Sequence, residues 1–306
     1  MRNQKLKGNL LLLFTAVVWG ASFIAQSKGV EQVSPVAFIG IRSLLGSAVL
    51  LPVILFLDRR RKKKGREVMG WNKPLWLGGI LCGLFLCAAT TLQTMGMVET
   101  SPGKAGFITA LYMVIIPLCQ IFRGRKPSSA VLVSVLLAVG GMYLMCIGGS
   151  FTLNRGDLLI FACAFFFAGH ILVIDHFSPM VDGIKLSCVQ FFVCGLINTC
   201  WMLLFEEVTL GPILQSWMSI GYAGVFSCGV AYTLQIVGQK YTDPTSASII
   251  MSLESVFATL FTVLCVALGW DLTGGQLTLK ELCGCALMFG AILLVQLPDL
   301  RQKKNT

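Results

Sequence analysis

One acidic side chain, Glu254, lies deep inside an apolar run of the sequence. The run begins about nine residues earlier, which is roughly 12 Å along a helix that rises about 1.5 Å per residue. A carboxylate at that depth in a membrane costs about 3 kcal/mol unless it is paired or neutralised. We therefore expect Glu254 to exchange a proton or to bind an ammonium group of a ligand. The alternative is a structural ion pair, for instance with Arg42.

Three more polar side chains interrupt apolar runs. Gln93 and Gln235 occupy matching positions in two similar stretches. Glutamine both donates and accepts hydrogen bonds, so ligand contact and an interhelical bond worth about 1 kcal/mol are equally good interpretations. Arg42 is expected near the outer end of its run, where it could bind an anion, extend its guanidinium to the membrane surface, or pair with Glu254.

Aromatic residues and one histidine complete the candidates. Trp19, Tyr112 and Tyr232 could line a ligand cavity, although aromatic side chains more often only pack. His170 follows a run of three phenylalanines, and no second histidine or cysteine stands at metal-ligand spacing. We therefore expect no metal and no cofactor, and for His170 we favour a hydrogen-bonded packing role over a place on the cavity.

A different chemistry is suggested by Gly20-Ala21-Ser22. A nucleophilic Ser22 with His170 as its base would make an intramembrane serine protease. The next residue is Phe23, where such a motif needs glycine, so the sequence does not favour this alternative. The ATP-binding motif G-x-x-x-x-G-K-[ST] does not occur, so ATP is not expected to drive the chain directly.

Composition defines the elements that must position these residues. Hydrophobic residues make up 56% of the chain and charged residues only 12%, against about a quarter in a soluble domain. Uncharged runs of about 20 residues predict membrane-spanning helices, since lipid offers no partners for free backbone groups. We predict an all-α polytopic membrane protein with ten transmembrane helices, at residues 8–27, 36–57, 74–97, 103–122, 128–148, 156–174, 184–205, 214–238, 245–268 and 281–297.

Lysine and arginine predict the orientation. With the amino terminus in the cytoplasm, 19 of the 24 basic residues fall in cytoplasmic segments and four fall outside. The positive-inside rule therefore predicts that both termini are cytoplasmic. Residues 59–64 are six consecutive basic residues in an expected loop between two spans. This run favours contact with anionic lipids at the cytoplasmic face rather than with nucleic acid.

An internal repeat organises the chain. Residues 89–112 match residues 231–254 at a shift of 142 with ten identities, and Gly8 matches Gly156 at a shift of 148. These matches predict two five-helix repeats, residues 8–148 and 156–297. Because each repeat has an odd number of spans, the two insert in opposite directions. Transporters with inverted repeats bind their substrate near the membrane midplane, where the halves meet around a cavity.

The repeat also pairs two threonine–proline segments. Thr100 and Pro102 precede one apolar run, and Thr242 and Pro244 precede its equivalent. In the inverted arrangement the two segments lie at opposite faces of the membrane. Each segment could therefore gate access from its own face.

Several motifs stand in a recognisable order: Trp19-Gly20-Ala21-Ser22-Phe23 in the first span, Arg42 early in the second, and Ser252-Leu253-Glu254 in the ninth. With two five-span halves, they resemble the EamA branch of the drug/metabolite transporter superfamily over about residues 8–297. Ser255 stands where that family commonly has proline. The resemblance implies a basket of helices around a central cavity, and export or exchange of small metabolites such as amino acids.

Together these features predict a secondary transporter. It would move a small metabolite, an amino acid or similar organic solute, across the plasma (inner) membrane by alternating access, with export as the favoured direction. Its partners would be the substrate and anionic lipids, and two copies could associate as a homodimer. The alternatives are the intramembrane enzyme described above and a channel or lipid-handling membrane protein.

Overall fold

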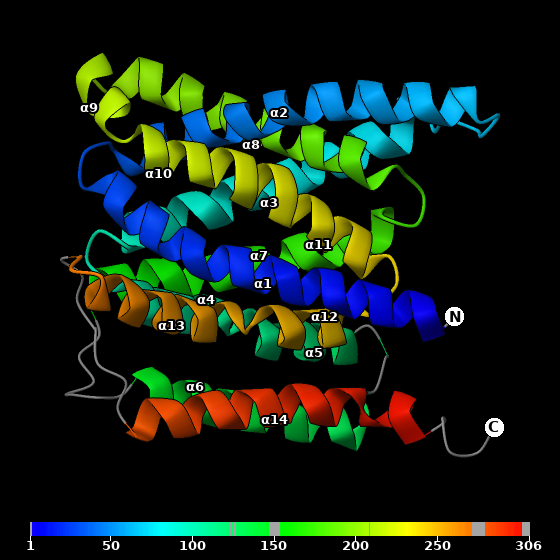
Figure 1. Cartoon of the computed structure of the whole chain (residues 1–306), viewed down its shortest axis with the longest axis vertical. Helices are drawn as coiled ribbons and strands as arrows, with labels where there is room; N and C mark the ends of the chain where they lie inside the picture. Colours follow the sequence, from blue (N-terminus) through cyan, green and yellow to red (C-terminus); the bar gives the residue numbers. More distant parts are fainter. Residues whose placement is uncertain are drawn as a thin grey trace.

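The computed structural model describes residues 2–122, 124, 127–146, 154–207, 209–270 and 279–301, and all regular structure in these ranges is helical. The elements are α1 (Arg2–Val30), α2 (Pro35–Lys63), α3 (Lys73–Gly96), α4 (Pro102–Ala110), α5 (Tyr112–Phe122), α6 (Ser129–Cys146), α7 (Arg155–Phe177), α8 (Gly183–Phe205), α9 (Leu210–Gln215), α10 (Trp217–Gly221), the π-helix η1 (Tyr222–Ala231), α11 (Tyr232–Gln239), α12 (Pro244–Met251), α13 (Glu254–Ala267) and α14 (Leu279–Arg301). The long helices run side by side, and the start of α1 and the end of α14 lie at the same end of the bundle (Figure 1).

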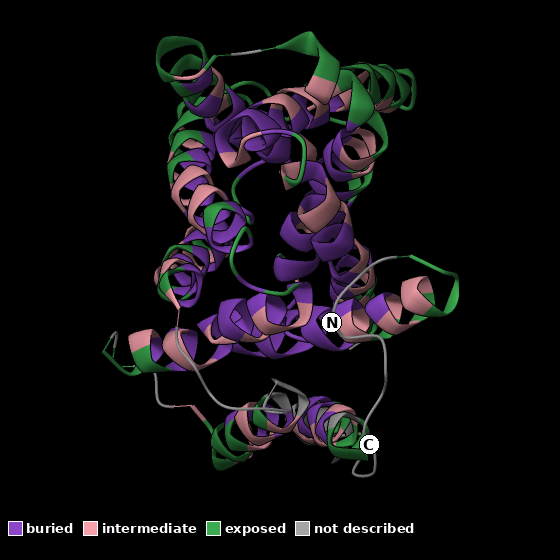
Figure 2. Ribbon diagram, turned by 90° about the vertical axis from the view of Figure 1, so that its left-hand side faces the viewer, coloured by how far each residue is buried: buried purple, intermediate pink, exposed green. Residues whose placement is uncertain are grey.

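The outside of the bundle is apolar. Phe122 and Leu204, for example, are 90% and 74% exposed, whereas the buried residues face inward (Figure 2). Within the described ranges, eight segments are long and apolar enough to cross a bilayer, and shorter apolar helices cover 129–141 and 282–294. The chain is therefore an all-helical polytopic membrane protein with eight to ten apolar helices.

Two of the expected spans are interrupted helices. The segment 103–122 breaks at Leu111, between α4 and α5, and the segment 245–268 breaks at Ser252 and Leu253, between α12 and α13. Near the second break, hydroxyls compete with the backbone: Ser252 Oγ donates to the carbonyl of Ile249 at 2.8 Å. At the first break, Leu111 donates to the carbonyl three residues back instead of four.

The expected span 214–238 is also irregular. It comprises α9, α10, the ten-residue π-helix η1 and α11. Glycine weakens the preference for α-helix, and Gly224 also allows α2 to approach closely. A Cβ on Gly224 would lie 2.7 Å from the Leu45 side chain and 3.0 Å from the carbonyl oxygen of Arg42. Helical irregularities of this kind are frequent at functional sites.

We expected the basic run at residues 59–64 to form a loop, and this expectation is wrong. Helix α2 continues to Lys63, and Lys64 caps its carboxyl end. Arginine and lysine are good helix formers, and their charges oppose the negative end of the helix dipole. The helix therefore extends beyond the apolar run that predicts the span.

The duplication is visible in where helices begin. Equivalent helices start at the shifts found in the sequence, 142 to 150 residues: α2 and α8 at Pro35 and Gly183, α4 and α12 at Pro102 and Pro244, α5 and α13 at Tyr112 and Glu254, and α6 and α14 at Ser129 and Leu279. The halves are interleaved, because α2 packs on α8, α3 on α7, and α1 on α11 and α13. Helices α6 and α14 pack mainly on each other and contact α4 and α12 (Figure 2).

Two glycine pairs allow the halves to approach. A Cβ on Gly96 of α3 would lie 2.6 Å from the carbonyl oxygen of Gly156 at the start of α7. The equivalent pair is Gly238 of α11 and Gly8 of α1, where the corresponding distance is 3.0 Å. Both pairs join one half to the other, so this packing is repeated at two places in the bundle.

We expect Gly96→Ala to lower the thermal midpoint of the detergent-solubilised protein. The added methyl group meets the Ile160 side chain at 2.5 Å and the backbone carbonyl oxygen of Gly156 at 2.6 Å, and overpacking of this kind costs about 1–3 kcal/mol. The matched control is Gly140→Ala in α6, where a Cβ would meet nothing within 4 Å and helix propensity improves. A lower midpoint for Gly140→Ala than for Gly96→Ala would contradict this account.

An ion-pair cluster joins α2 to the start of α8. Asp182 accepts hydrogen bonds from the backbone N–H groups of Ile184 and Lys185 and pairs with Arg61. The buried Lys185 pairs in turn with Asp58 at 2.8 Å. Burial alone would raise the pKa of Asp182, but the hydrogen bond from Arg61 and those from the backbone outweigh burial and hold the pKa below its usual value of 3.8.

Asp182→Asn is expected to reduce stability at neutral pH by on the order of 1 kcal/mol, because Arg61 is partly exposed. Asparagine still caps α8, so only the charge is lost. A lowered folded pKa gives stability that is present above the unfolded pKa and is lost as pH falls through the folded pKa. Thermal midpoints of the two proteins should therefore differ at pH 7 and converge below about pH 3.8. A gap that persists at low pH would contradict the assignment.

Candidate functional site

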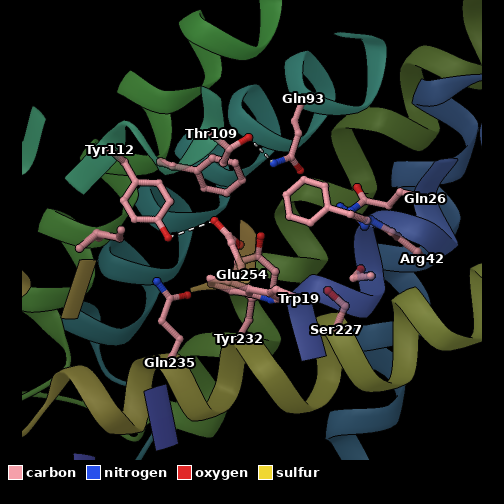
Figure 3. Close-up of a pocket in the computed structure, with 14 residues that line it drawn as sticks. Trp19, Gln26, Arg42, Gln93, Thr109, Tyr112, Ser227, Tyr232, Gln235 and Glu254 are labelled. Carbon is pink, nitrogen blue, oxygen red and sulfur yellow. Dashed lines mark hydrogen bonds between the residues drawn. The ribbon is translucent and has the colours of Figure 1, made fainter. Parts of the chain in front are cut away.

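A cavity lies beside the interrupted helices, and residues of both halves line it (Figure 3). The space between its walls, open solvent included, is about 410 Å³. The lining residues are Trp19, Ser22, Phe23, Gln26, Arg42, Gln93, Thr109, Tyr112, Phe167, Ile171, Ser227, Tyr232, Gln235 and Glu254.

Glu254 is the first residue of α13 and is only 4% exposed. Its Oε1 accepts a hydrogen bond from the hydroxyl of Tyr112 at 3.1 Å (Figure 3). Tyr112, the equivalent residue, is the first residue of α5. The start of a helix carries partial positive charge, so the break before α13 favours a carboxylate at this position. The interruption thus places Glu254 on the cavity, and the helix start offsets part of the cost of burying its charge.

Arg42 lies on the same cavity but is not bonded to Glu254. It is 2% exposed, and its guanidinium carbon lies 5.5 Å from the centre of the Phe38 ring. Among the described residues, its Nε and Nη1 atoms have no hydrogen-bond partner. The two alternatives of a surface anchor and an ion pair with Glu254 are therefore wrong. The reason is that α2 directs the Arg42 side chain into the interior of the bundle and not toward the membrane surface.

The two equivalent glutamines differ in their contacts. The amide nitrogen of Gln93 donates to the hydroxyl of Thr109 at 2.9 Å (Figure 3). The amide oxygen of Gln235 has no partner among the described residues. Gln93 therefore combines an interhelical bond with a place on the cavity. Gln235 has an acceptor available to a ligand.

Aromatic rings form the apolar part of the wall. Trp19 and Tyr232 lie with their ring centres 4.5 Å apart, and Tyr112 meets the edge of Phe167 at 6.5 Å. The wall thus combines flat apolar surfaces with a carboxylate, a guanidinium and three amides. Such a combination suits a small organic molecule that carries charged or polar groups.

His170 does not line the cavity. Its Nε2 lies 2.9 Å from the amide oxygen of Gln190, and its ring packs against Tyr232 at 6.0 Å. Ser22 does line the cavity, but its hydroxyl has no hydrogen-bond partner among the described residues. The hydrogen bond between serine and histidine that a protease needs is therefore not formed.

The expected gating residues lie outside the cavity, at contacts between the halves. The hydroxyl of Thr100 donates to Asp157 at the start of α7 at 3.0 Å. The hydroxyl of Thr242 donates to Asn9 of α1 at 2.9 Å. Asn9 and Asp157 are equivalent residues at the shift of 148, so the two contacts correspond to each other.

Sequence reasoning missed several lining residues. Ser22, Phe23 and Gln26 follow Trp19 at spacings of three, four and seven, so helical periodicity could have placed them on its face. Phe167 is equivalent to Trp19 at the shift of 148, so the repeat could have found it. The sequence has no comparable signal for Ser227, since its place depends on the π-helix.

The fold and this cavity define a class: a duplicated helical membrane protein with a polar cavity lined by both halves. The model of the EamA-like transporter family matches residues 6–147 and again residues 154–297. The chain belongs to the EamA-like transporter family. It is therefore a multi-pass membrane transporter rather than an enzyme, and the predicted family is confirmed.

Individual relatives agree with this assignment. The chain is 28% identical over 300 residues to a protein of Archaeoglobus fulgidus described as an uncharacterized transporter, covering 96% of this chain and 87% of the relative. It is 22% identical to the inner membrane transporter YedA of Escherichia coli K12, covering 95% and 90%. A solved crystal structure of 20% identity superposes with a TM-score of 0.72, covering 96% and 98%, which supports the fold.

Proposed function

We propose that the protein is a secondary transporter that moves a small organic solute by alternating access of two inverted halves, residues 8–148 and 156–297. The observation that carries this proposal is the pair of unlike charges on one cavity, Glu254 and Arg42, which are not bonded to each other. A substrate with both an ammonium and a carboxylate group, such as an amino acid, would meet a partner at each end.

Two interrupted helices support alternation. In transporters with inverted repeats, broken helices commonly flank the substrate site, and the halves rock about it. Here the breaks, at Leu111 and at Ser252–Leu253, lie directly before Tyr112 and Glu254, which are bonded to each other. A change in what Glu254 binds would therefore act on both halves through this hydrogen bond.

The two contacts between the halves suit a role as gates. Thr100 with Pro102, and Thr242 with Pro244, open the helices α4 and α12. Thr100 bonds to Asp157 in the first turn of α7. Thr242 bonds to Asn9 within α1, so each threonine contacts a helix of the other half. In the inverted arrangement these contacts would close opposite faces. Among the described residues, the contact at Asp157 carries an ion pair, with Lys104, and the contact at Asn9 carries none, so the two gates would differ in strength.

The surroundings follow from the charges and from the relatives. We place both termini in the cytoplasm on the positive-inside rule, and the protein in the plasma (inner) membrane, as YedA is described. The basic end of α2 would contact anionic lipids at that face. Export is the favoured direction, and association of two copies is compatible with the apolar outside.

A metabolite profile tests the proposal. Cells that express the protein and cells that express the Arg42→Gln/Glu254→Gln double variant at the same level in the membrane are compared for solutes in the cell and in the medium. We expect one solute or one chemical class to differ, and the purified protein in liposomes to exchange that solute with saturation. Flux that never saturates would instead indicate a channel.

A further inference from the structure

The second half contains a polar pair that the cavity does not use. His170 and Gln190 are both 0% exposed and are joined through His170 Nε2 and Gln190 Oε1. Their remaining polar atoms, His170 Nδ1 and Gln190 Nε2, have no hydrogen-bond partner in the part of the chain that the structure describes. Buried polar atoms are normally paired, so each unpaired atom needs an explanation.

The repeat relates this pair to two residues on the cavity. At the shift of 148, His170 is equivalent to Ser22, and Gln190 is equivalent to Arg42. Ser22 and Arg42 line the cavity, and His170 and Gln190 do not. These two positions of the fold therefore line the cavity in the first half and are buried away from it in the second half.

A residue beside this pair, Tyr232, differs from its equivalent in the first half. Tyr232 lines the cavity, and its ring packs on His170 at 6.0 Å and on Phe191 at 5.2 Å. Its equivalent at the shift of 142 is Thr90, which does not line the cavity. Threonine has no ring, whereas the ring of Tyr232 packs against His170 of the polar pair in the second half.

We propose that His170 and Gln190 form a second substrate subsite, which joins the cavity when it opens to the opposite face of the membrane. The inference rests on the proposed alternation of inverted halves. When such halves exchange conformations, a position that lines the cavity in one half comes to line it in the other. Ser22 and Arg42 would then leave the cavity as His170 and Gln190 enter it.

The chemistry of this subsite differs from that of its equivalent. The amide oxygen of Gln190 can only accept, so His170 Nε2 donates the hydrogen bond between them, and a neutral ring leaves Nδ1 as an acceptor. Nε2 of Gln190 remains as a donor. The subsite therefore takes a substrate group that both accepts and donates a hydrogen bond. When Gln190 replaces Arg42 on the cavity, an anionic substrate group bound to Arg42 would lose its cationic partner. This loss favours release of the substrate.

Accessibility of equivalent positions tests the proposal. Ser22→Cys, His170→Cys and Gln190→Cys are labelled separately in right-side-out and inside-out vesicles with a charged, membrane-impermeant methanethiosulfonate, and mass spectrometry resolves each site from the native cysteines. We expect Ser22→Cys to react at least tenfold faster from one face, and His170→Cys and Gln190→Cys at least tenfold faster from the other. Reaction of all three from the same face would overturn the proposal.

Gln93→Cys and Gln235→Cys separate this inference from the proposed function. These equivalent residues both line the cavity, so alternation predicts that each reacts from both faces. If they do, and neither His170→Cys nor Gln190→Cys reacts from either face, the subsite is wrong and alternation stands. If they react from one face only, alternation fails and the subsite fails with it.

A second measurement tests whether the Tyr232 ring shields His170. The chain has two histidines, and His176 is exposed, so His176→Gln leaves His170 as the only histidine that diethyl pyrocarbonate can modify, and mass spectrometry resolves that site from other modified residues. In that background, Tyr232→Thr introduces threonine, the residue at the equivalent position 90 of the first half. We expect His170 to be modified at least tenfold faster. An unchanged rate in the folded protein would overturn the difference between the halves on which the subsite depends.

Discussion

Replacing Glu254 by glutamine is expected to lower the transport rate about ten- to a hundredfold. Glutamine keeps the size of the side chain and can still accept the hydrogen bond from Tyr112, so the change removes mainly the charge. A hydrogen bond between charged groups contributes about 1.5–3 kcal/mol, and each 1.4 kcal/mol is a factor of about ten. Initial rates in proteoliposomes, with the solute found by profiling, measure the effect.

The response to a pH gradient separates the two roles of Glu254. If this carboxylate carries a proton, an imposed gradient accelerates the wild-type protein and not Glu254→Gln. If it binds a substrate ammonium group, the KM rises and the response to the gradient remains. Unchanged rates and an unchanged response would discard both roles.

Glu31→Gln is the matched control for Glu254→Gln. Glu31 is an exposed acid just after α1, paired with Lys28 at 2.9 Å and remote from the cavity lining. The same chemical change at this position should leave the transport rate unaltered. A comparable loss of transport at Glu31 would show that the assay responds to charge in general.

Arg42→Gln is expected to change stability and transport in opposite directions. A buried cation without a hydrogen-bonded acid carries a desolvation cost that no partner offsets, and a neutral side chain removes that cost. Contact with the Phe38 ring offsets part of that cost. We therefore expect the thermal midpoint to rise by a few degrees while transport falls at least tenfold. Glutamine is chosen because it is the equivalent residue, Gln190, in the second half.

The control for this prediction is Arg155→Gln, at an exposed position at the start of α7. Removing this charge should alter neither the thermal midpoint by more than about 1 °C nor the transport rate, because surface charges contribute little. The prediction is wrong if Arg42→Gln lowers the midpoint as well as transport. That result would mean that the guanidinium stabilises the fold.

The sequence by itself determined the class of protein and the duplication. A bilayer accepts only backbones that satisfy their own hydrogen bonds, so long uncharged runs can be interpreted locally as helices. Polar residues inside such runs are conspicuous for the same reason, and Glu254, Arg42 and both glutamines do lie on the cavity wall. The shift between residues 89–112 and 231–254 relates helices that begin at equivalent positions along the chain, α4 with α12 and α5 with α13.

Only the tertiary structure decided where the helices are interrupted and which polar groups meet. The apolar pattern runs through Leu111 and Ser252 unbroken, so it could not show the breaks that set Tyr112 and Glu254 at helix starts. Likewise, the sequence has two opposite charges inside apolar runs, Arg42 and Glu254, which suggests an ion pair between them. In the structure the carboxylate bonds to Tyr112 instead. This pairing depends on a contact between residues 142 positions apart, and local pattern carries no information about such contacts.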